Sequence, residues 1–193
     1  MTATRILIAE DNELVALTLE EQLTALGYQV VGVARSGTEA VRLTRLLSPD
    51  LVIMDMQLPE MNGDEAAREI GRQHPTPVVM LTAYSDSEHI RRAEASGALA
   101  YLVKPVNPEE LPPTIDVALA RFQELRSLRE RIDTLQEEIE ARKIIERAKG
   151  ILMQRRKIGG EQAMQLMRQW AEERKKTVRE IAQAIVDAEA LLS

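Results

Sequence analysis

The chain has 193 residues, 45% of them hydrophobic, which suffices for one domain of ordinary size with a buried core and a smaller second domain. It has no cysteine, which excludes disulfides, thiolate metal ligands and thiol catalysis. The formal net charge of -6 is unevenly spread: the first 122 residues carry 18 acidic and 10 basic side chains, whereas residues 141–193 carry 7 and 12. The basic end suits a polyanionic partner, although a solvated helical surface produces the same charge pattern.

Five short apolar runs alternate with helical patterns over the first part of the chain. The runs cover residues 5–9, 28–34, 51–54, 77–81 and 99–103, and the helical patterns between them cover 14–26, 38–47, 64–72 and 87–96. This alternation predicts an α/β fold, a doubly wound, five-stranded parallel sheet with helices on both faces. The start, MTATRILIAED, reaches acidic residues before an apolar run long enough for a signal peptide, and no later run approaches the ~20 apolar residues of a membrane span. We therefore expect a cytoplasmic protein with no membrane partner.

The fifth helical segment begins awkwardly and then runs on without interruption. Because Pro112 and Pro113 would break the hydrogen-bond ladder, we expect a short irregular turn first and a firm helix from about Pro113. Apolar residues then recur at alternating spacings of three and four, as in a heptad seam: Leu125, Leu128, Ile132, Leu135 and Ile139. About two repeats leave two alternatives open, a homodimer and packing against the chain's own tail.

The remaining residues predict a small all-helical unit that follows the long helix. Amphipathic patterns cover residues 142–156, 161–174 and 178–186, with Gly159-Gly160 ending the first and Thr177 able to cap the last. Three short helices bury little surface, so this unit needs the seam helix or a second copy for support.

Polar residues stand at the ends of several expected strands. Asp55 follows the most apolar run, and Glu10 and Asp11 follow the first one. The first and third strands are neighbours in a doubly wound sheet, so the three carboxylates should meet, and an all-oxygen set favours Mg²⁺. Thr82 and Lys104 end the fourth and fifth strands; a hydroxyl and an ammonium beside a carboxylate and a hard metal suit an incoming phosphoryl group.

These residues lie in motifs that resemble a known family. The acidic pair after the first strand, IMDMQLPEMNG around Asp55, LTAY with Thr82 and AYLVKP with Tyr101 and Lys104 are similar to the receiver domains of two-component response regulators. The resemblance covers residues 5 to about 122 and implies a flavodoxin-like sheet of order 2-1-3-4-5.

Several residue roles follow from this resemblance alone. It implies that Asp55 accepts a phosphoryl group from a sensor histidine kinase, and that Mg²⁺ is held by Asp11, Asp55 and the backbone carbonyl of Gln57, with Glu10 assisting through water. Thr82 and Lys104 would bind the phosphoryl oxygens, and Tyr101 would turn inward when Thr82 moves. The Lys104-Pro105 peptide bond is expected to be cis.

The tail resembles a second family, the ANTAR domain, which is the RNA-binding module of transcription antitermination regulators. The similar segments are ERAKGILM (146–153), EQAMQLMRQWAEERKKT (161–177) and VREIAQAIV (178–186). This resemblance implies binding to leader transcripts that contain a hairpin. The chain is thereby divided into a receiver domain (1–122), a helical linker or coiled-coil seam (123–140) and an ANTAR-like helical domain (141–193).

We therefore predict a phosphorylation-dependent response regulator that binds RNA, acts as a transcription antiterminator and turns over no separate substrate, so that it is not an enzyme. Two alternatives remain: a DNA-binding regulator with a helix-turn-helix, and an adaptor that binds a protein through the seam. The candidates for RNA contact are eleven basic side chains of the tail and its one aromatic ring: Arg142, Lys143, Arg147, Lys149, Arg155, Arg156, Lys157, Trp170, Arg174, Lys175, Lys176 and Arg179. The helical pattern places Trp170 on a buried face, and base stacking is its alternative role.

Overall fold

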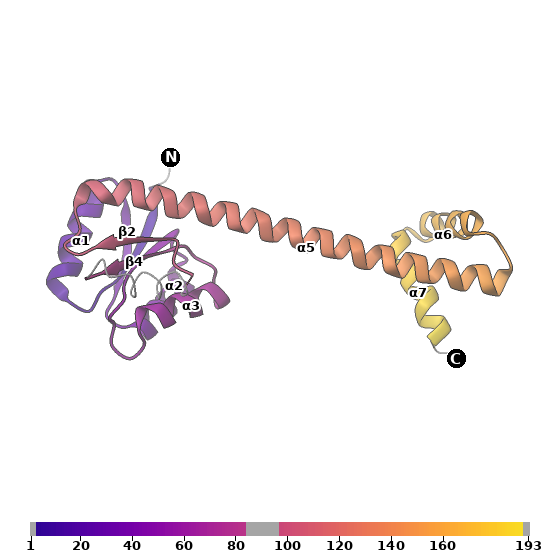
Figure 1. Cartoon of the computed structure of the whole chain (residues 1–193), viewed down its shortest axis with the longest axis horizontal. Helices are drawn as coiled ribbons and strands as arrows, with labels where there is room; N and C mark the ends of the chain where they lie inside the picture. Colours follow the sequence, from indigo (N-terminus) through magenta and orange to yellow (C-terminus); the bar gives the residue numbers. More distant parts are fainter. Residues whose placement is uncertain (1–2, 84–96, 191–193) are drawn as a thin grey trace. The chain divides into compact units, whose positions relative to one another are not determined.

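The structure is a computed structural model that describes residues 3–83 and 97–190 (Figure 1). The chain forms two compact units, Met1–Arg126 and Ser127–Ser193, which are described separately below. The expected division at residues 122 and 140 remains a prediction, because both positions lie inside one continuous helix, α5 (Leu111–Arg156).

The first unit is built on a parallel sheet of five strands in the order β2-β1-β3-β4-β5. The strands are β1 (Arg5–Ala9), β2 (Gln29–Ala34), β3 (Leu51–Asp55), β4 (Val78–Thr82) and β5 (Ala100–Val103). Every residue of the central strand β3 is buried, which explains why its sequence is an unbroken apolar run rather than an alternating one. The expected fold class and strand order are confirmed.

Helices cover both faces of this sheet (Figure 1). Alternate residues of β1 point to opposite sides, so Ile6 and Ile8 pack with α1 (Glu13–Ala25) and the start of α5, whereas Leu7 packs with α2 (Gly37–Leu47) and α3 (Gly63–Gln73). Asn12 caps α1 by accepting hydrogen bonds from the backbone N–H groups of residues 14 and 15. The helix expected at residues 87–96 lies outside the described residues.

The entry of α5 differs from the expectation. A single 3₁₀ turn (Pro108–Glu110) leads directly into α5 at Leu111, rather than into a helix from about Pro113. Pro112 and Pro113 are tolerated because they occupy the first turn, where backbone N–H groups have no partner inside the helix. Leu111 and Ile115 are completely buried, so this first part of α5 is anchored by packing on the sheet.

The second unit consists of the later part of α5 with α6 (Gly160–Arg174) and α7 (Val178–Ala190). Its core is made largely of small and unbranched side chains: Ala148, Leu152, Ala163, Met167, Ala171, Ile181, Ala182 and Val186. Thr177 caps α7 as expected. Its hydroxyl oxygen accepts from the backbone N–H of Glu180 at 3.2 Å, while the Glu180 carboxylate accepts from the backbone N–H of Thr177 at 2.7 Å.

The heptad seam is not covered by the described part of the chain. Its five apolar side chains are 45% to 56% exposed: Leu125, Leu128, Ile132, Leu135 and Ile139. Packing of the seam against the chain's own tail, one of the two alternatives, is therefore wrong for the described residues. Although α5 has 46 residues, neither it nor another described helix has the apolar stretch that crossing a bilayer requires.

Candidate functional site

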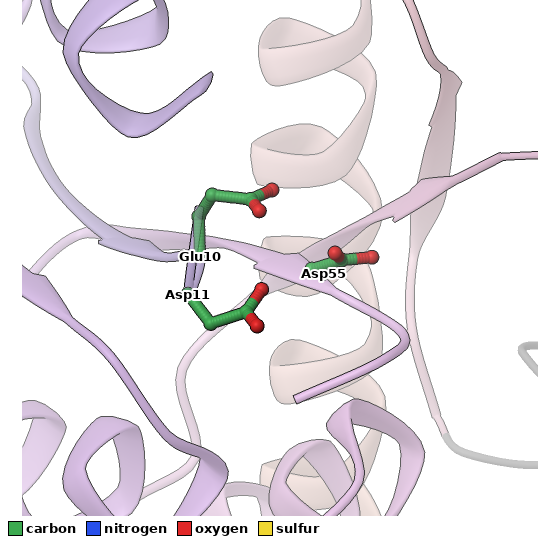
Figure 2. A group of neighbouring side chains, drawn as sticks. All are labelled: Glu10, Asp11 and Asp55. Carbon is green, nitrogen blue, oxygen red and sulfur yellow. The ribbon is translucent and has the colours of Figure 1, made fainter. Parts of the chain in front are cut away.

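Three carboxylates meet where β1 and β3 end (Figure 2). Glu10 and Asp11 directly follow β1, and Asp55 is the last residue of the neighbouring strand β3. One carboxylate oxygen from each residue lies within 4.8 Å of the other two. Glu10 is 1% exposed and Asp55 9%, while Asp11 is exposed, so the group opens to solvent on one side only.

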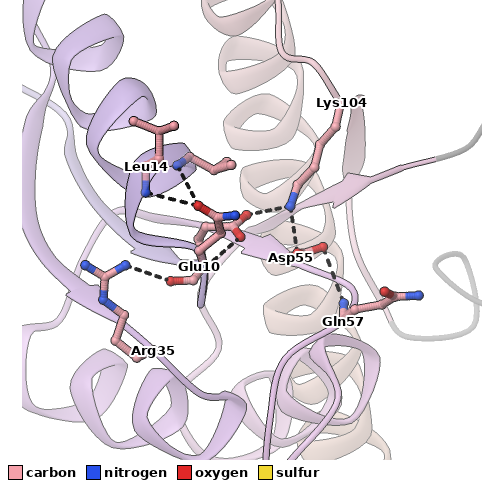
Figure 3. Close-up of polar contacts among 8 residues, drawn as sticks. Glu10, Leu14, Arg35, Asp55, Gln57 and Lys104 are labelled. Carbon is pink, nitrogen blue, oxygen red and sulfur yellow. Dashed lines mark hydrogen bonds and ion pairs between the residues drawn. The ribbon is translucent and has the colours of Figure 1, made fainter.

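The ammonium group of Lys104 bridges two of these acids (Figure 3). Its Nζ donates to Glu10 Oε2 at 2.5 Å and to Asp55 Oδ2 at 2.7 Å. Lys104 follows β5, and its backbone N–H donates to the carbonyl of Thr82 at 2.8 Å, which holds the two strand ends together. The Lys104-Pro105 peptide bond is cis, as expected.

Burial and hydrogen bonding act against each other on these two charges. Burial raises the pKa of the Glu10 carboxyl, and the hydrogen bond from Lys104 only partly offsets that rise. Burial would lower the pKa of Lys104, but the hydrogen bonds to Asp55 and Glu10 and the negative charges of these two acids together outweigh burial, so the pKa of Lys104 lies above its ordinary value. Lys104 is therefore an ammonium group at neutral pH, a single positive charge beside three acidic groups.

The donor set fits a hard divalent cation. The three carboxylates supply oxygen atoms only, and an open pocket is lined by Glu10, Asp11, Asp55, Gln57 and Lys104 together with neighbouring loop residues. The backbone N–H of Gln57 donates to Asp55 Oδ1 at 3.3 Å, so this residue turns back beside the acid that it follows (Figure 3). Oxygen ligands without histidine or cysteine favour Mg²⁺ over transition metals.

The two remaining residues of the expected switch lie on neighbouring strands at the same end of the sheet. Asp55 is in register with Leu81, so Thr82 lies one residue beyond it, and Thr82 is only 6% exposed. Tyr101 is half-buried on β5, in register with Met80. Their roles as phosphoryl contact and switch stay predictions.

Two polar residues near the site were missed by the sequence reasoning. Arg35, which directly follows β2, donates from Nη1 to the backbone carbonyl of Glu10 at 3.3 Å (Figure 3). Asn12 lines the pocket, and its backbone N–H donates to Glu10 Oε1 at 3.2 Å. The rule that identified Asp55 also applies to Arg35, because both stand where a parallel strand ends.

In the second unit, the basic candidates divide into paired and unpaired groups. Lys143 pairs with Glu140 at 2.7 Å, Lys149 with Glu146 at 2.8 Å, and Arg155 with Glu189 at 3.0 Å. By contrast, the guanidinium groups of Arg156 and Arg174 lie over the ring of Trp170, 5.3 Å and 6.0 Å from its centroid. Within the described residues, none of the other candidates forms an ion pair with a carboxylate, although the charge of Lys176 helps to lower the pKa of Glu180: Arg142, Arg147, Lys157, Lys175, Lys176 and Arg179.

Two family models match different parts of this chain. The model of the response regulator receiver domain matches residues 6–116, and the model of the ANTAR domain matches residues 133–186. The transcriptional regulatory protein PdtaR of Mycobacterium tuberculosis is 41% identical over 183 residues, which covers 95% of this chain and 89% of PdtaR.

Solved structures resemble the first unit. The receiver domain of a modulated diguanylate cyclase from Desulfovibrio desulfuricans superposes with a TM-score of 0.59 at 35% identity, over 63% of this chain and 98% of that one. The response regulator domain of CheB from Thermotoga maritima gives a TM-score of 0.58 at 27% identity, over 62% and 98%.

Sheet order, the acidic group at the strand ends and the bridging lysine together define a receiver domain of a two-component response regulator. The chain belongs to the response regulators that join this domain to an ANTAR domain, and it has an RNA-binding antiterminator role. Both matched segments are regulatory modules, and neither is an enzymatic domain.

Proposed function

We propose that phosphorylation of Asp55 by a sensor histidine kinase controls RNA binding by the tail. The observation that carries this proposal is the position of Lys104, whose ammonium lies 2.7 Å from Asp55 Oδ2 at the mouth of an acidic pocket. In the transfer, an Asp55 oxygen attacks phosphorus, the bond from phosphorus to the histidine nitrogen breaks, and the new acyl phosphate carries its charge on the phosphoryl oxygens.

Mg²⁺ supplies positive charge to the phosphoryl oxygens when it is bound. Asp11, Asp55 and the backbone carbonyl of Gln57 would hold the ion, with Glu10 acting through water. Support comes from the three converging carboxylates and from Asp11, which is exposed and has no ion-pair partner in the described part of the chain. Lys104 then pairs with a phosphoryl oxygen in place of the Asp55 carboxylate, and the Thr82 hydroxyl donates to another.

Movement of Thr82 would transmit the phosphorylation of Asp55 to the neighbouring strand β5. Tyr101 lies on the neighbouring strand and is half-buried, so an inward turn of its ring changes the surface at β5. Because β5 leads through the 3₁₀ turn into α5, this change reaches the helix that continues into the second unit.

The active form is proposed to be a homodimer that pairs along the seam. Five apolar side chains at heptad spacing, each about half-exposed, are a surface that a second copy of the same helix can cover. Replacing Leu128 and Leu135 together by Asp should weaken dimerisation by more than about 100-fold, since two buried leucines per helix are lost. Sedimentation measures this change; an unaltered mass would leave the seam to a different protein, as the adaptor alternative requires.

One experiment tests the switch as a whole. The full chain is titrated with a hairpin RNA and, at the same salt concentration, with duplex DNA, with and without beryllofluoride and Mg²⁺. The proposal is supported if beryllofluoride tightens hairpin binding by the unsubstituted chain and has no such effect on Asp55→Asn. Equal binding in both states would contradict phosphorylation control, and preference for duplex DNA would favour the DNA-binding alternative.

A further inference from the structure

Trp170 holds an unusual position in the tail because two arginines from different helices lie over its ring. Arg156 is the last residue of α5 and Arg174 the last residue of α6, and their guanidinium carbons are 5.3 Å and 6.0 Å from the ring centroid. The indole packs against the tail core and is itself half-buried, so part of it remains accessible.

The type of contact matters for what these arginines can bind. In an ion pair, the carboxylate neutralises the guanidinium charge and occupies its N–H donors. Arg155 is an example, because it donates two hydrogen bonds to Glu189, at 3.1 Å and 3.0 Å. A cation–π contact instead holds the guanidinium without neutralising its charge and leaves its N–H donors available. Neither Arg156 nor Arg174 forms an ion pair with a carboxylate in the described residues.

A nucleotide combines the two groups that such a site recognises. The planar guanidinium fork matches phosphate oxygens, and the part of the indole that remains accessible offers a stacking surface to a base. Only an unpaired base can stack there, since the bases of a duplex are occupied by their neighbours. The local charge favours a polyanion further, because Lys157 follows Arg156, and Lys175 and Lys176 follow Arg174.

We propose that Arg156, Trp170 and Arg174 form a binding site for an unpaired nucleotide of RNA, with its phosphate on the two guanidinium groups and its base on the indole. This inference rests on the proposed function, in which the tail binds a hairpin, and adds which three side chains hold one unpaired nucleotide of it. Arg155, adjacent in sequence but paired with Glu189, is left with a structural role.

Trp170 is the only tryptophan of the chain, so its fluorescence reports on this site alone. The full chain is titrated with a hairpin that has an unpaired loop and with a blunt RNA duplex of equal length. Stacking of a base on the indole should quench the emission with the hairpin and leave it unchanged with the duplex. Equal quenching by both RNAs would contradict the assignment to an unpaired nucleotide.

Variants separate the site from the general basic surface. Trp170→Leu should weaken hairpin binding by about 5- to 150-fold, the value of one stacked base, whereas Trp170→Phe keeps a flat ring and most of the affinity. Arg156→Ala and Arg174→Ala should each reduce the slope of log affinity against log salt by about 0.7, as expected for one lost phosphate contact on a single strand. Arg168→Ala, which changes an exposed arginine of α6 outside the predicted contact set, is the matched control and should leave the slope unchanged.

Thermal unfolding of each variant guards against a purely structural explanation, because arginines at helix C-termini also stabilise helices. A lower melting temperature with unaltered hairpin affinity and salt slope in Trp170→Leu, Arg156→Ala and Arg174→Ala would overturn the site while leaving RNA binding by the tail intact. If the unsubstituted chain binds no RNA, the proposed function fails and the site fails with it.

Discussion

The two charged regions of this protein handle their charges in opposite ways. At the strand ends, Glu10 and Asp55 are buried and share one ammonium group, so their charges are partly compensated within the fold. In the tail, Arg156 and Arg174 lie against an aromatic ring and keep their charges uncompensated. A buried charge needs a partner of opposite sign because it has lost its contact with water, whereas an exposed charge is stabilised by water until a ligand binds. The first arrangement suits a small, exchangeable ligand, and the second suits an extended polyanion.

The acids of the two regions should differ most in metal binding. Asp11→Asn removes one of three converging carboxylates and should weaken Mg²⁺ binding by about 10- to 100-fold. Glu172→Gln, which removes an exposed acid of the tail, should have no effect. Calorimetric titration of the full chain with Mg²⁺ checks both; equal affinities would show that the acidic group is not the metal site.

The lysines of the two regions should differ in their contribution to stability. Lys104→Ala leaves Glu10 and Asp55 without their shared partner and should lower the free energy of unfolding by about 2 kcal/mol. Lys143→Ala, which breaks an exposed pair with Glu140, should cost less than about 0.5 kcal/mol.

Chemical denaturation measures this difference, and Mg²⁺ should recover part of the stability lost in Lys104→Ala because the ion replaces the missing positive charge. No recovery would mean that the ammonium and the metal do not neutralise the same carboxylates.

A smaller effect on stability is expected at the start of α7, where the cap joins two residues that are only three positions apart. Thr177→Ala removes the hydroxyl that accepts from the Glu180 backbone N–H and should cost about 1 kcal/mol, while Thr177→Ser keeps the oxygen and most of the stability. Denaturation monitored through Trp170 follows the tail alone, since this residue is the only tryptophan. Equal losses in both variants would argue that the methyl group matters rather than the cap.

The smallest effects concern pH, and they have opposite signs in the two regions. Burial raises the pKa of Glu10 above its ordinary value of 4.5, so the folded state loses stability relative to Glu10→Gln as pH rises through that raised pKa. Hydrogen bonds from Thr177 lower the pKa of Glu180, so the stability that Glu180 provides is present above 4.5 and is lost as pH falls through the lowered pKa.

Unfolding free energies of each variant and the unsubstituted chain, measured from about pH 3 to pH 7, give the two differences. Curves of the same sign for Glu10→Gln and Glu180→Gln would contradict the contrast between a buried carboxyl and a hydrogen-bonded one.

Much of the fold could be predicted because its signals are short-range. The apolar run before Asp55, the cap at Thr177 and the alternation of strands with helices depend on residues within a few positions of each other, and the strand order followed from a family resemblance. The start of α5 was missed by two residues because a proline pair is tolerated in the first turn of a helix but breaks the helix further along, and the sequence does not say which position the pair occupies.

The sequence by itself determined which residues stand at the strand ends, and hence that Glu10, Asp55 and Lys104 share one edge of the sheet. Only the tertiary structure decided that Lys104 bridges both acids, that Arg35 donates to the Glu10 carbonyl, and that Trp170 has arginines from two helices over its ring. The physical reason is range: periodicity and caps arise from neighbours along the chain, whereas the partner of a charged side chain depends on which distant residues folding brings within a few ångströms.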